Sequence, residues 1–158
     1  MGAVKGVKAR FEGLTGVFKT LAEQHGEVTA LLLRVKSSAD KRAELWPKIR
    51  IELLSHEKGE LREVYPALRD DAQTRPMAEQ HDREAGQLES QIQRIDALEL
   101  DSPHWQTEFD RLVELVKQHV DEEESTIFPK AQEVLGKDRA REMEPRFMAA
   151  KRAVMEQA

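Results

Sequence analysis

Four histidines and two glutamates recur in this sequence with a spacing that suits metal binding. They follow the order His, then His-x-x-x-Glu, twice along the chain: His25, His56, Glu60, His81, His119 and Glu123. Residues i and i+4 of an α-helix lie one turn apart on the same face, so an imidazole and a carboxylate at this spacing can reach the same small volume. Neutral imidazoles suit iron, and carboxylates can bridge two hard ions. The pattern therefore predicts a metal pair.

The two halves of the chain also match around these residues. The tetrapeptide Ala-Glu-Gln-His occurs at 22–25 and again at 78–81. An aromatic–proline pair begins five residues after each glutamate of the motif, at Tyr65 and at Phe128. Two similar helical hairpins could therefore each supply two histidines and one carboxylate. A pair of metals on a pseudo-twofold axis follows from this repeat.

The six residues all stand in apolar stripes with helical periodicity, where a charged side chain is unexpected. Carboxylates are almost never fully buried without a partner. An ionised carboxylate that is buried without compensation is very costly, and two metal cations would supply the compensating charge. The alternative is a plain bundle in which the histidines are ordinary core residues.

Five apolar stripes with steps of three or four residues predict helices. They cover residues 4–35, 45–67, 77–95, 105–127 and 143–154. Glycines weaken the first stripe, so its firm helix is expected to begin near Thr15. Thr74, two residues before Pro76, and Ser102, directly before Pro103, are expected to open the third and fourth helices. Gly136 marks the expected end of the fourth.

The expected fold is all-α, an antiparallel up-down four-helix bundle with a short extra C-terminal helix. We expect a single domain over residues 1–158, with the bundle at about 15–135 and the C-terminal helix at about 138–156. Pro47 predicts either a late start or a kink in the second helix. Pro145 is expected in the first turn of the C-terminal helix, or at a kink.

The composition narrows the function classes. The chain has 158 residues, of which 39% are hydrophobic and 35% charged, and this suits a helical protein with charged outer faces. The lack of cysteine excludes disulfides, thiolate zinc sites and iron–sulfur clusters. The net charge of −5 argues against a basic surface that would bind nucleic acid. No apolar stretch approaches the roughly 20 residues that span a bilayer. We expect a cytoplasmic protein without nucleic-acid or membrane partners.

Taken together, the order of the motif, its helical phase and the aromatic–proline pairs resemble the hemerythrin-like, or HHE cation-binding, family over roughly residues 15–135. The resemblance implies an up-down four-helix bundle with an oxo- or hydroxo-bridged pair of iron ions. By position it implies one iron on His25 and His56, a second on His81 and His119, and bridges from Glu60 and Glu123. Zinc or manganese could occupy the same ligands.

One departure from the family lies on the third helix, where oxygen-carrying hemerythrins have two histidines one turn apart. The positions one turn either side of His81 are Met77 and Ala85. We expect the second iron to keep an open or solvent-occupied position, or to take Glu84 or Tyr65 as an additional ligand. An open position favours peroxide or other small-molecule chemistry over simple oxygen storage, because inner-sphere substrates need vacant sites.

Several residues beside the motif carry weaker expectations. Gln24 and Gln80 could accept hydrogen bonds that orient imidazoles, although an outward orientation is as compatible with their positions. Tyr65 is expected to pack at the end of the bundle rather than to take part in redox chemistry. In the acidic run 121–124, only Glu123 is phased toward the core.

Two function classes remain open. In the first, the centre is an enzyme that decomposes H2O2, or reduces another oxygen species, in a dry cavity lined by Leu53, Leu88 and Val116. In the second, it binds O2 or NO, or senses iron or redox state, without turnover. Iron storage or delivery is a weaker third class, because the Glu-x-x-His spacing of ferritin-type sites is missing from the chain.

Overall fold

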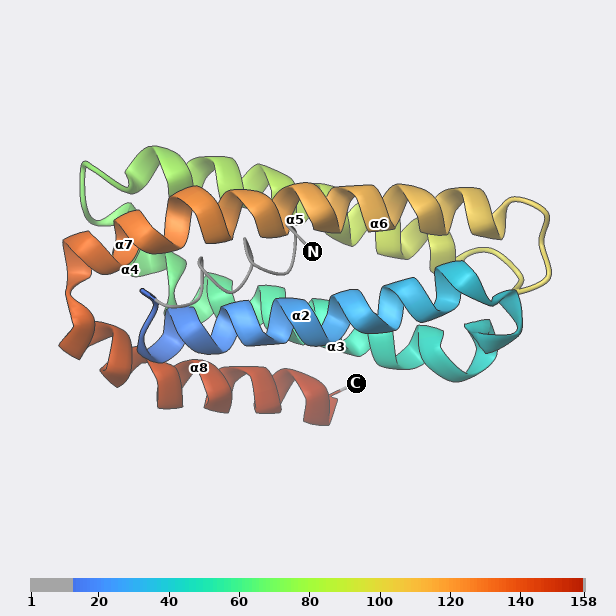
Figure 1. The fold of residues 1–158 in the computed structure, drawn as a ribbon, viewed down its shortest axis with the longest axis horizontal. Helices are drawn as coiled ribbons and strands as arrows, with labels where there is room; N and C mark the ends of the chain where they lie inside the picture. Colours follow the sequence, from blue (N-terminus) through green and yellow to red (C-terminus); the bar gives the residue numbers. More distant parts are fainter. Residues whose placement is uncertain (1–12, 158) are drawn as a thin grey trace.

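The computed structural model describes residues 13–157, and within that range the chain forms helices and no strands. Four long helices run up and down beside one another (Figure 1). They are α2 (Gly16–Ser37), α3 (Arg42–Glu63), α5 (Arg75–Asp96) and α6 (Trp105–Glu122). The prediction of an all-α bundle is confirmed. The part of the first apolar stripe that precedes residue 13 lies outside the described residues.

Shorter helices join these four and extend the last one. A 3-10 turn, η1 (Ala39–Lys41), leads from α2 into α3, and α4 (Tyr65–Arg69) follows α3. A π-helix, η2 (Glu123–Ile127), and then α7 (Phe128–Leu135) continue α6. The long helix α8 (Lys137–Gln157) completes the chain. Figure 1 shows α4 and α7 at the same end of the bundle.

Most predicted helix limits lie close to the observed ones. Helix α2 begins at Gly16, one residue after the expected start, and α7 ends at Leu135 before Gly136, whose φ of 90° lies in the left-handed region. Helix α3 continues through Pro47, so the expected late start is wrong. Thr74 precedes α5 as predicted, but its hydroxyl donates to the carbonyl of Leu68 at 2.6 Å rather than capping the helix.

A break follows each His-x-x-x-Glu motif, because a proline stands six residues after each glutamate. Proline lacks an amide hydrogen, and its ring collides with the carbonyl four residues earlier. In the first half Pro66 is the second residue of α4, and α3 ends at Glu63. In the second half Pro129 is the second residue of α7, and the preceding turn widens into the π-helix η2. The same sequence feature therefore gives two different local structures.

Helix α8 lies where the C-terminal helix was expected, because the expected range of about 138–156 differs from the observed one by one residue at each end. Its 21 residues make it nearly as long as α2, which has 22. Pro145 lies inside the helix, not in its first turn. In Figure 1, α8 runs along α2 and α3. The approach is close at Gly59, because a Cβ there would lie 2.7 Å from Cε1 of Phe147. Helix α8 thus covers the first half of the bundle.

Two apolar clusters fill the bundle on either side of its middle. One gathers Phe18, Tyr65, Phe128 and Phe147 toward the end where α4 and α7 lie. The other contains the expected core aromatics Trp46 and Trp105, whose rings meet edge to face at 5.9 Å. In α2, residues 17–22 belong to the first cluster and 28–35 to the second, so His25 lies between them. No helix within residues 13–157 is both long and apolar enough to cross a bilayer.

Candidate metal centre

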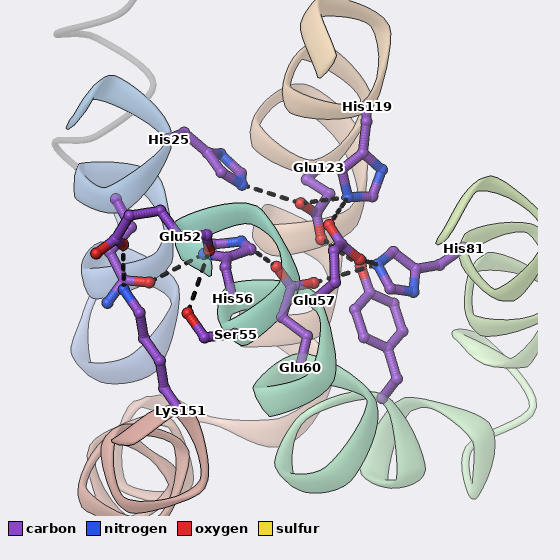
Figure 2. A network of polar contacts seen from close by, with 12 residues as sticks. His25, Glu52, Ser55, His56, Glu57, Glu60, His81, His119, Glu123 and Lys151 are labelled. Carbon is purple, nitrogen blue, oxygen red and sulfur yellow. Dashed lines mark hydrogen bonds and ion pairs between the residues drawn. The ribbon is translucent and has the colours of Figure 1, made fainter. Parts of the chain in front are cut away.

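The structure brings all six predicted residues into one buried volume between the two apolar clusters (Figure 2). Their side chains form two overlapping groups in which the candidate ligand atoms all lie within 4.8 Å of one another. The first group is His25, His56, Glu60 and Glu123, and the second is Glu57, Glu60, His81 and His119. Each group takes its residues from more than one helix, so the fold assembles both.

Two carboxylates connect the groups. Glu60 contacts Nε2 of His56 with one oxygen, and its other oxygen lies 3.2 Å from Nε2 of His81. Oε1 of Glu123 lies 3.0 Å from Nε2 of His25 and 3.1 Å from Nε2 of His119. Both carboxylates therefore stand between the two pairs of histidines. This is the arrangement that the expected bridging role requires.

Glu57 is a member of the second group that the sequence interpretation missed. Its Oε1 lies 2.8 Å from Nε2 of His119, and its Oε2 lies 3.1 Å from Nε2 of His81. A signal for it exists, since Leu53, Glu57 and Glu60 follow one another by steps of four and three residues, as a helix face requires. The prediction assigned this stripe to His56 and Glu60, and overlooked Glu57 on the same side of the helix.

The two residues expected as additional ligands belong to neither group. Oε2 of Glu84 accepts a hydrogen bond from Nδ1 of His119 at 3.1 Å, on the opposite side of the ring from the centre. The hydroxyl of Tyr65 donates to Oε2 of Glu123 at 2.6 Å. Its ring lies parallel to that of His81, with 3.6 Å between centroids and 9° between planes. Glu57, rather than either of them, extends the second group.

Two further imidazoles have acceptors behind them. Nδ1 of His25 lies 2.8 Å from Oε2 of Glu124, and Nδ1 of His56 lies 2.9 Å from Oε1 of Gln24. An acceptor at Nδ1 holds the hydrogen there and leaves the Nε2 lone pair directed inward. The expectation for Gln24 is confirmed, whereas Gln80 donates to Glu84 and reaches no imidazole.

The burial of Glu124 corrects the prediction that only Glu123 faces inward in the run 121–124. Both glutamates are buried, and both contact His25. They are the first two residues of the π-helix η2. A π-helical turn is wider than an α-helical turn, so the 3.6-residue period used for the prediction does not hold there. Sequence periodicity alone had no means of locating this turn.

The charges of the carboxylates dominate the ionisation of two histidines. Burial by itself lowers the pKa of His25, but hydrogen bonds to Glu123 and Glu124 outweigh it and raise that pKa to about 9. Burial likewise opposes protonation of His81, and the carboxylates that face it raise its pKa to about 10. Protons on these rings supply positive charge that the buried carboxylates require.

Two other groups of the cluster instead favour their uncharged forms. Burial and the neighbouring His25 lower the pKa of His56 to about 3. Burial and the adjacent Glu123 and Glu57 raise the pKa of Glu60 well above its usual range. Metal cations would supply the same positive charge by displacing protons from the ligands.

The unpaired atoms of the cluster match a metal-ligand set. The buried atoms without a hydrogen-bond partner in the described residues include Nε2 of His25, His56, His81 and His119, Oε2 of Glu57, both carboxylate oxygens of Glu60, and Oε1 of Glu123. Buried polar groups are rarely left without partners. Imidazole nitrogens combined with carboxylate oxygens suit iron, zinc or manganese. The residues present therefore fit a pair of metal ions.

A small cavity of about 20 Å³ adjoins this cluster. Its walls include three of the histidines and the apolar residues expected from the sequence, with two further valines: His25, His56, His119, Leu53, Leu88, Val116, Val28 and Val120. A space of this size holds about one water-sized molecule. A second cavity, of about 70 Å³, reaches His119 from the side of α5 and α6 and is lined in part by Glu84 and Gln118. Small molecules thus have room beside the histidines.

An all-helical bundle with a buried histidine–carboxylate cluster at its middle defines a class of helical metal-binding proteins. The comparison with protein families agrees with this class. The model of the hemerythrin HHE cation-binding domain matches residues 16–131, and the chain belongs to this family. No curated protein and no solved structure matches the chain. The family that the motif resembles is therefore confirmed.

Proposed function

We propose that this protein binds two iron ions at the centre and uses them to act on a small oxygen species, most of all H2O2. The observation that supports this function is the convergence of unpaired Nε2 atoms and carboxylate oxygens in one buried volume. Two groups that share Glu60 offer two adjacent positions for metal. When bound, an iron pair supplies coordination sites and electrons to an oxygen species.

The protein's own residues have distinct roles in this proposal. The first position is formed by His25 and His56, the second by His81, His119 and Glu57, and the bridges by Glu60 and Glu123. Glu124, Gln24 and Glu84 orient three of the imidazoles through Nδ1. Because Glu57 stands in the second group, that position has one more carboxylate than the first. A carboxylate-rich position favours a hard, oxidised metal ion.

The cavity supports a small substrate. Its volume of about 20 Å³ admits only a very small molecule, and H2O2, O2 and NO are among the smallest candidates. Reversible binding of O2 or NO without turnover is the alternative function, and the same cavity favours it. The two functions differ in whether the bound molecule is released unchanged.

The first test is the metal content and optical spectrum of protein purified without added metal. We expect about two irons per chain, the stoichiometry of a paired-carboxylate bundle site, and near-ultraviolet bands that respond to H2O2. Rapid peroxide consumption should disappear in His119→Ala and persist in His104→Ala, which changes an exposed histidine. A stable, reversible oxygen adduct without consumption would favour the carrier. Protein that takes up no iron under anaerobic conditions would rule out the proposal.

Iron binding should also release protons. At pH 7 the rings of His25 and His81 hold protons, because their pKa values are raised to about 9 and 10, and a metal ion must displace them. The apparent affinity for iron should therefore rise as the pH rises from 6 toward 9. Calorimetric titrations in two buffers with different ionisation enthalpies measure the release. An affinity that does not change with pH would contradict this view of the cluster.

A further inference from the structure

Tyr65 is the single tyrosine of the chain, and it lies against the centre. The side chain is fully buried. Its hydroxyl donates to Glu123 at 2.6 Å, and its ring is parallel to that of His81 with 3.6 Å between centroids. Tyr65 therefore touches a candidate bridge through its hydroxyl and a candidate ligand of the second position through its ring.

The matched residue in the other half shows that packing does not require this hydroxyl. Phe128 follows Glu123 at the offset at which Tyr65 follows Glu60. Its ring is stacked with that of His25, with 5.8 Å between centroids and 15° between planes. A phenyl ring thus closes one half of the centre, whereas a phenol closes the other. A buried hydroxyl is costly unless it is hydrogen-bonded, and that of Tyr65 is bonded to a carboxylate of the centre.

We propose that Tyr65 is a one-electron donor to the centre during reduction of H2O2. Tyr65 loses an electron to the centre, by way of the stacked His81, and gives its phenolic proton to Oε2 of Glu123. The product is a neutral tyrosyl radical. This inference rests on the proposed function, since it needs a metal pair that reacts with peroxide.

The step balances as follows. Reduction of H2O2 breaks the O–O bond and consumes two electrons and two protons to give two molecules of water. Tyr65 would supply one electron, and the other would come from a metal pair held by the two groups. Breaking the phenolic O–H bond transfers one proton to Glu123, which can pass it on to the reduced oxygen, and solvent supplies the second proton. A phenol that loses an electron needs an adjacent proton acceptor, and the contact with Glu123 provides one.

The surroundings of Tyr65 suit a radical that outlives the reaction. Val64, Leu68 and Phe128 belong with it to one buried apolar cluster. Trp46 and Trp105, the two tryptophans of the chain, belong to the other apolar cluster. Tyr65 is thus shielded from solvent and separated from the other readily oxidised aromatic rings.

The test is electron paramagnetic resonance on the iron-loaded protein, reduced by one electron per metal pair and frozen milliseconds after one equivalent of H2O2 is added. We expect an organic radical signal that narrows when the protein is made with ring-deuterated tyrosine. Because the chain has one tyrosine, this label reports on Tyr65 alone and leaves the fold unchanged. Tyr65→Phe, which reproduces the ring found at Phe128, should lose the signal and keep its iron.

Other results separate this inference from the function on which it rests. Protein that binds two irons and consumes peroxide without an organic radical would overturn the role of Tyr65 only. A radical signal that narrows with deuterated tryptophan, and not with deuterated tyrosine, would also overturn the role of Tyr65. So would a visible phenolate-to-iron charge-transfer band, because Tyr65 would then be a ligand. Protein that binds no iron would overturn both proposals.

Discussion

The two helical hairpins of this protein carry the same motif in different surroundings. Hairpin α2–α3 and hairpin α5–α6 each bring two histidines and one bridging glutamate to the centre. Among the matched offsets that differ between them, three lie at the centre: Glu57 corresponds to Val120, Leu61 to Glu124, and Tyr65 to Phe128. The repeat thus makes two similar candidate metal positions, and the substitutions around it make them chemically unequal. The candidate position of His81 and His119 gains the carboxylate of Glu57 and lies beside the phenol of Tyr65. The candidate position of His25 and His56 gains the carboxylate of Glu124 behind the ring of His25.

Helix α8 adds to this inequality, because it packs on the first hairpin. The ring of Phe147 meets that of His56 edge to face at 6.0 Å. The amide of Gln24, whose oxygen faces His56, donates to the sulfur of Met148 at 3.7 Å. On the second hairpin a cavity instead reaches His119. The first pair of histidines is therefore covered by a helix, while His119 adjoins a second cavity besides the one that it shares with His25 and His56.

Removal of a matched histidine should have the largest effect on iron binding, and the effect should be similar for the two hairpins. His56→Ala and His119→Ala each delete one imidazole from one position. We expect each to weaken iron binding there by about 100-fold or more, since loss of an outer partner alone costs about 10–100-fold. The bound iron should fall from about two per chain to about one. Competition with a chelator measures this, and two tightly held irons in either variant would contradict the assigned roles.

The second change should separate the hairpins. Glu57→Val gives the first hairpin the residue type that the second has at Val120. We expect iron at the position of His81 and His119 to bind about 10–100-fold more weakly, and the other position to change little. Val120→Ala is the matched control and should leave both affinities unchanged. Equal weakening of both positions would mean that Glu57 does not belong to one of them.

The third change tests the covering by α8. Gly59→Ala places a Cβ 2.7 Å from the ring of the buried Phe147, and should destabilise the metal-free protein by about 1–3 kcal/mol. Gly86→Ala places its Cβ in open space within α5 and should stabilise by about 0.5–1 kcal/mol. Urea unfolding of both variants measures the difference. A stabilised Gly59→Ala protein would show that α8 does not pack this closely.

The smallest expected effect concerns the acceptor behind His25. Glu124→Ala removes the partner of Nδ1 and should weaken iron binding at that position by about 10-fold. Glu124→Gln retains an acceptor and should lie between this variant and the unchanged protein. Leu61→Ala, at the matched offset on the first hairpin, should have no effect. If both alanine variants bind iron as the unchanged protein does, Glu124 has no orienting role.

The sequence was informative where a regular helix carries the residue. The six motif residues follow the 3.6-residue period, and the structure brings all of them together. Glu57 obeys the same period. It was missed because His56 and Glu57 are adjacent and both fit the helical spacing after Leu53, and the prediction used only His56. Glu124 could not be found this way, since the π-helix changes the period locally. The expected place of Pro145 in the first turn was wrong, because this proline lies inside a helix that packs on α2 and α3.

The π-helix η2 also has a consequence for the dynamics of the protein. A wide turn has weaker backbone hydrogen-bond geometry and persists only where surrounding contacts hold it. At its start those contacts are made by Glu123 and Glu124, whose side chains reach His25 and the middle of the centre. Ions that tie these side chains to the other helices would therefore slow local opening of Glu123–Ile127. Amide hydrogen exchange in this one turn would report the occupancy of the centre without any chromophore.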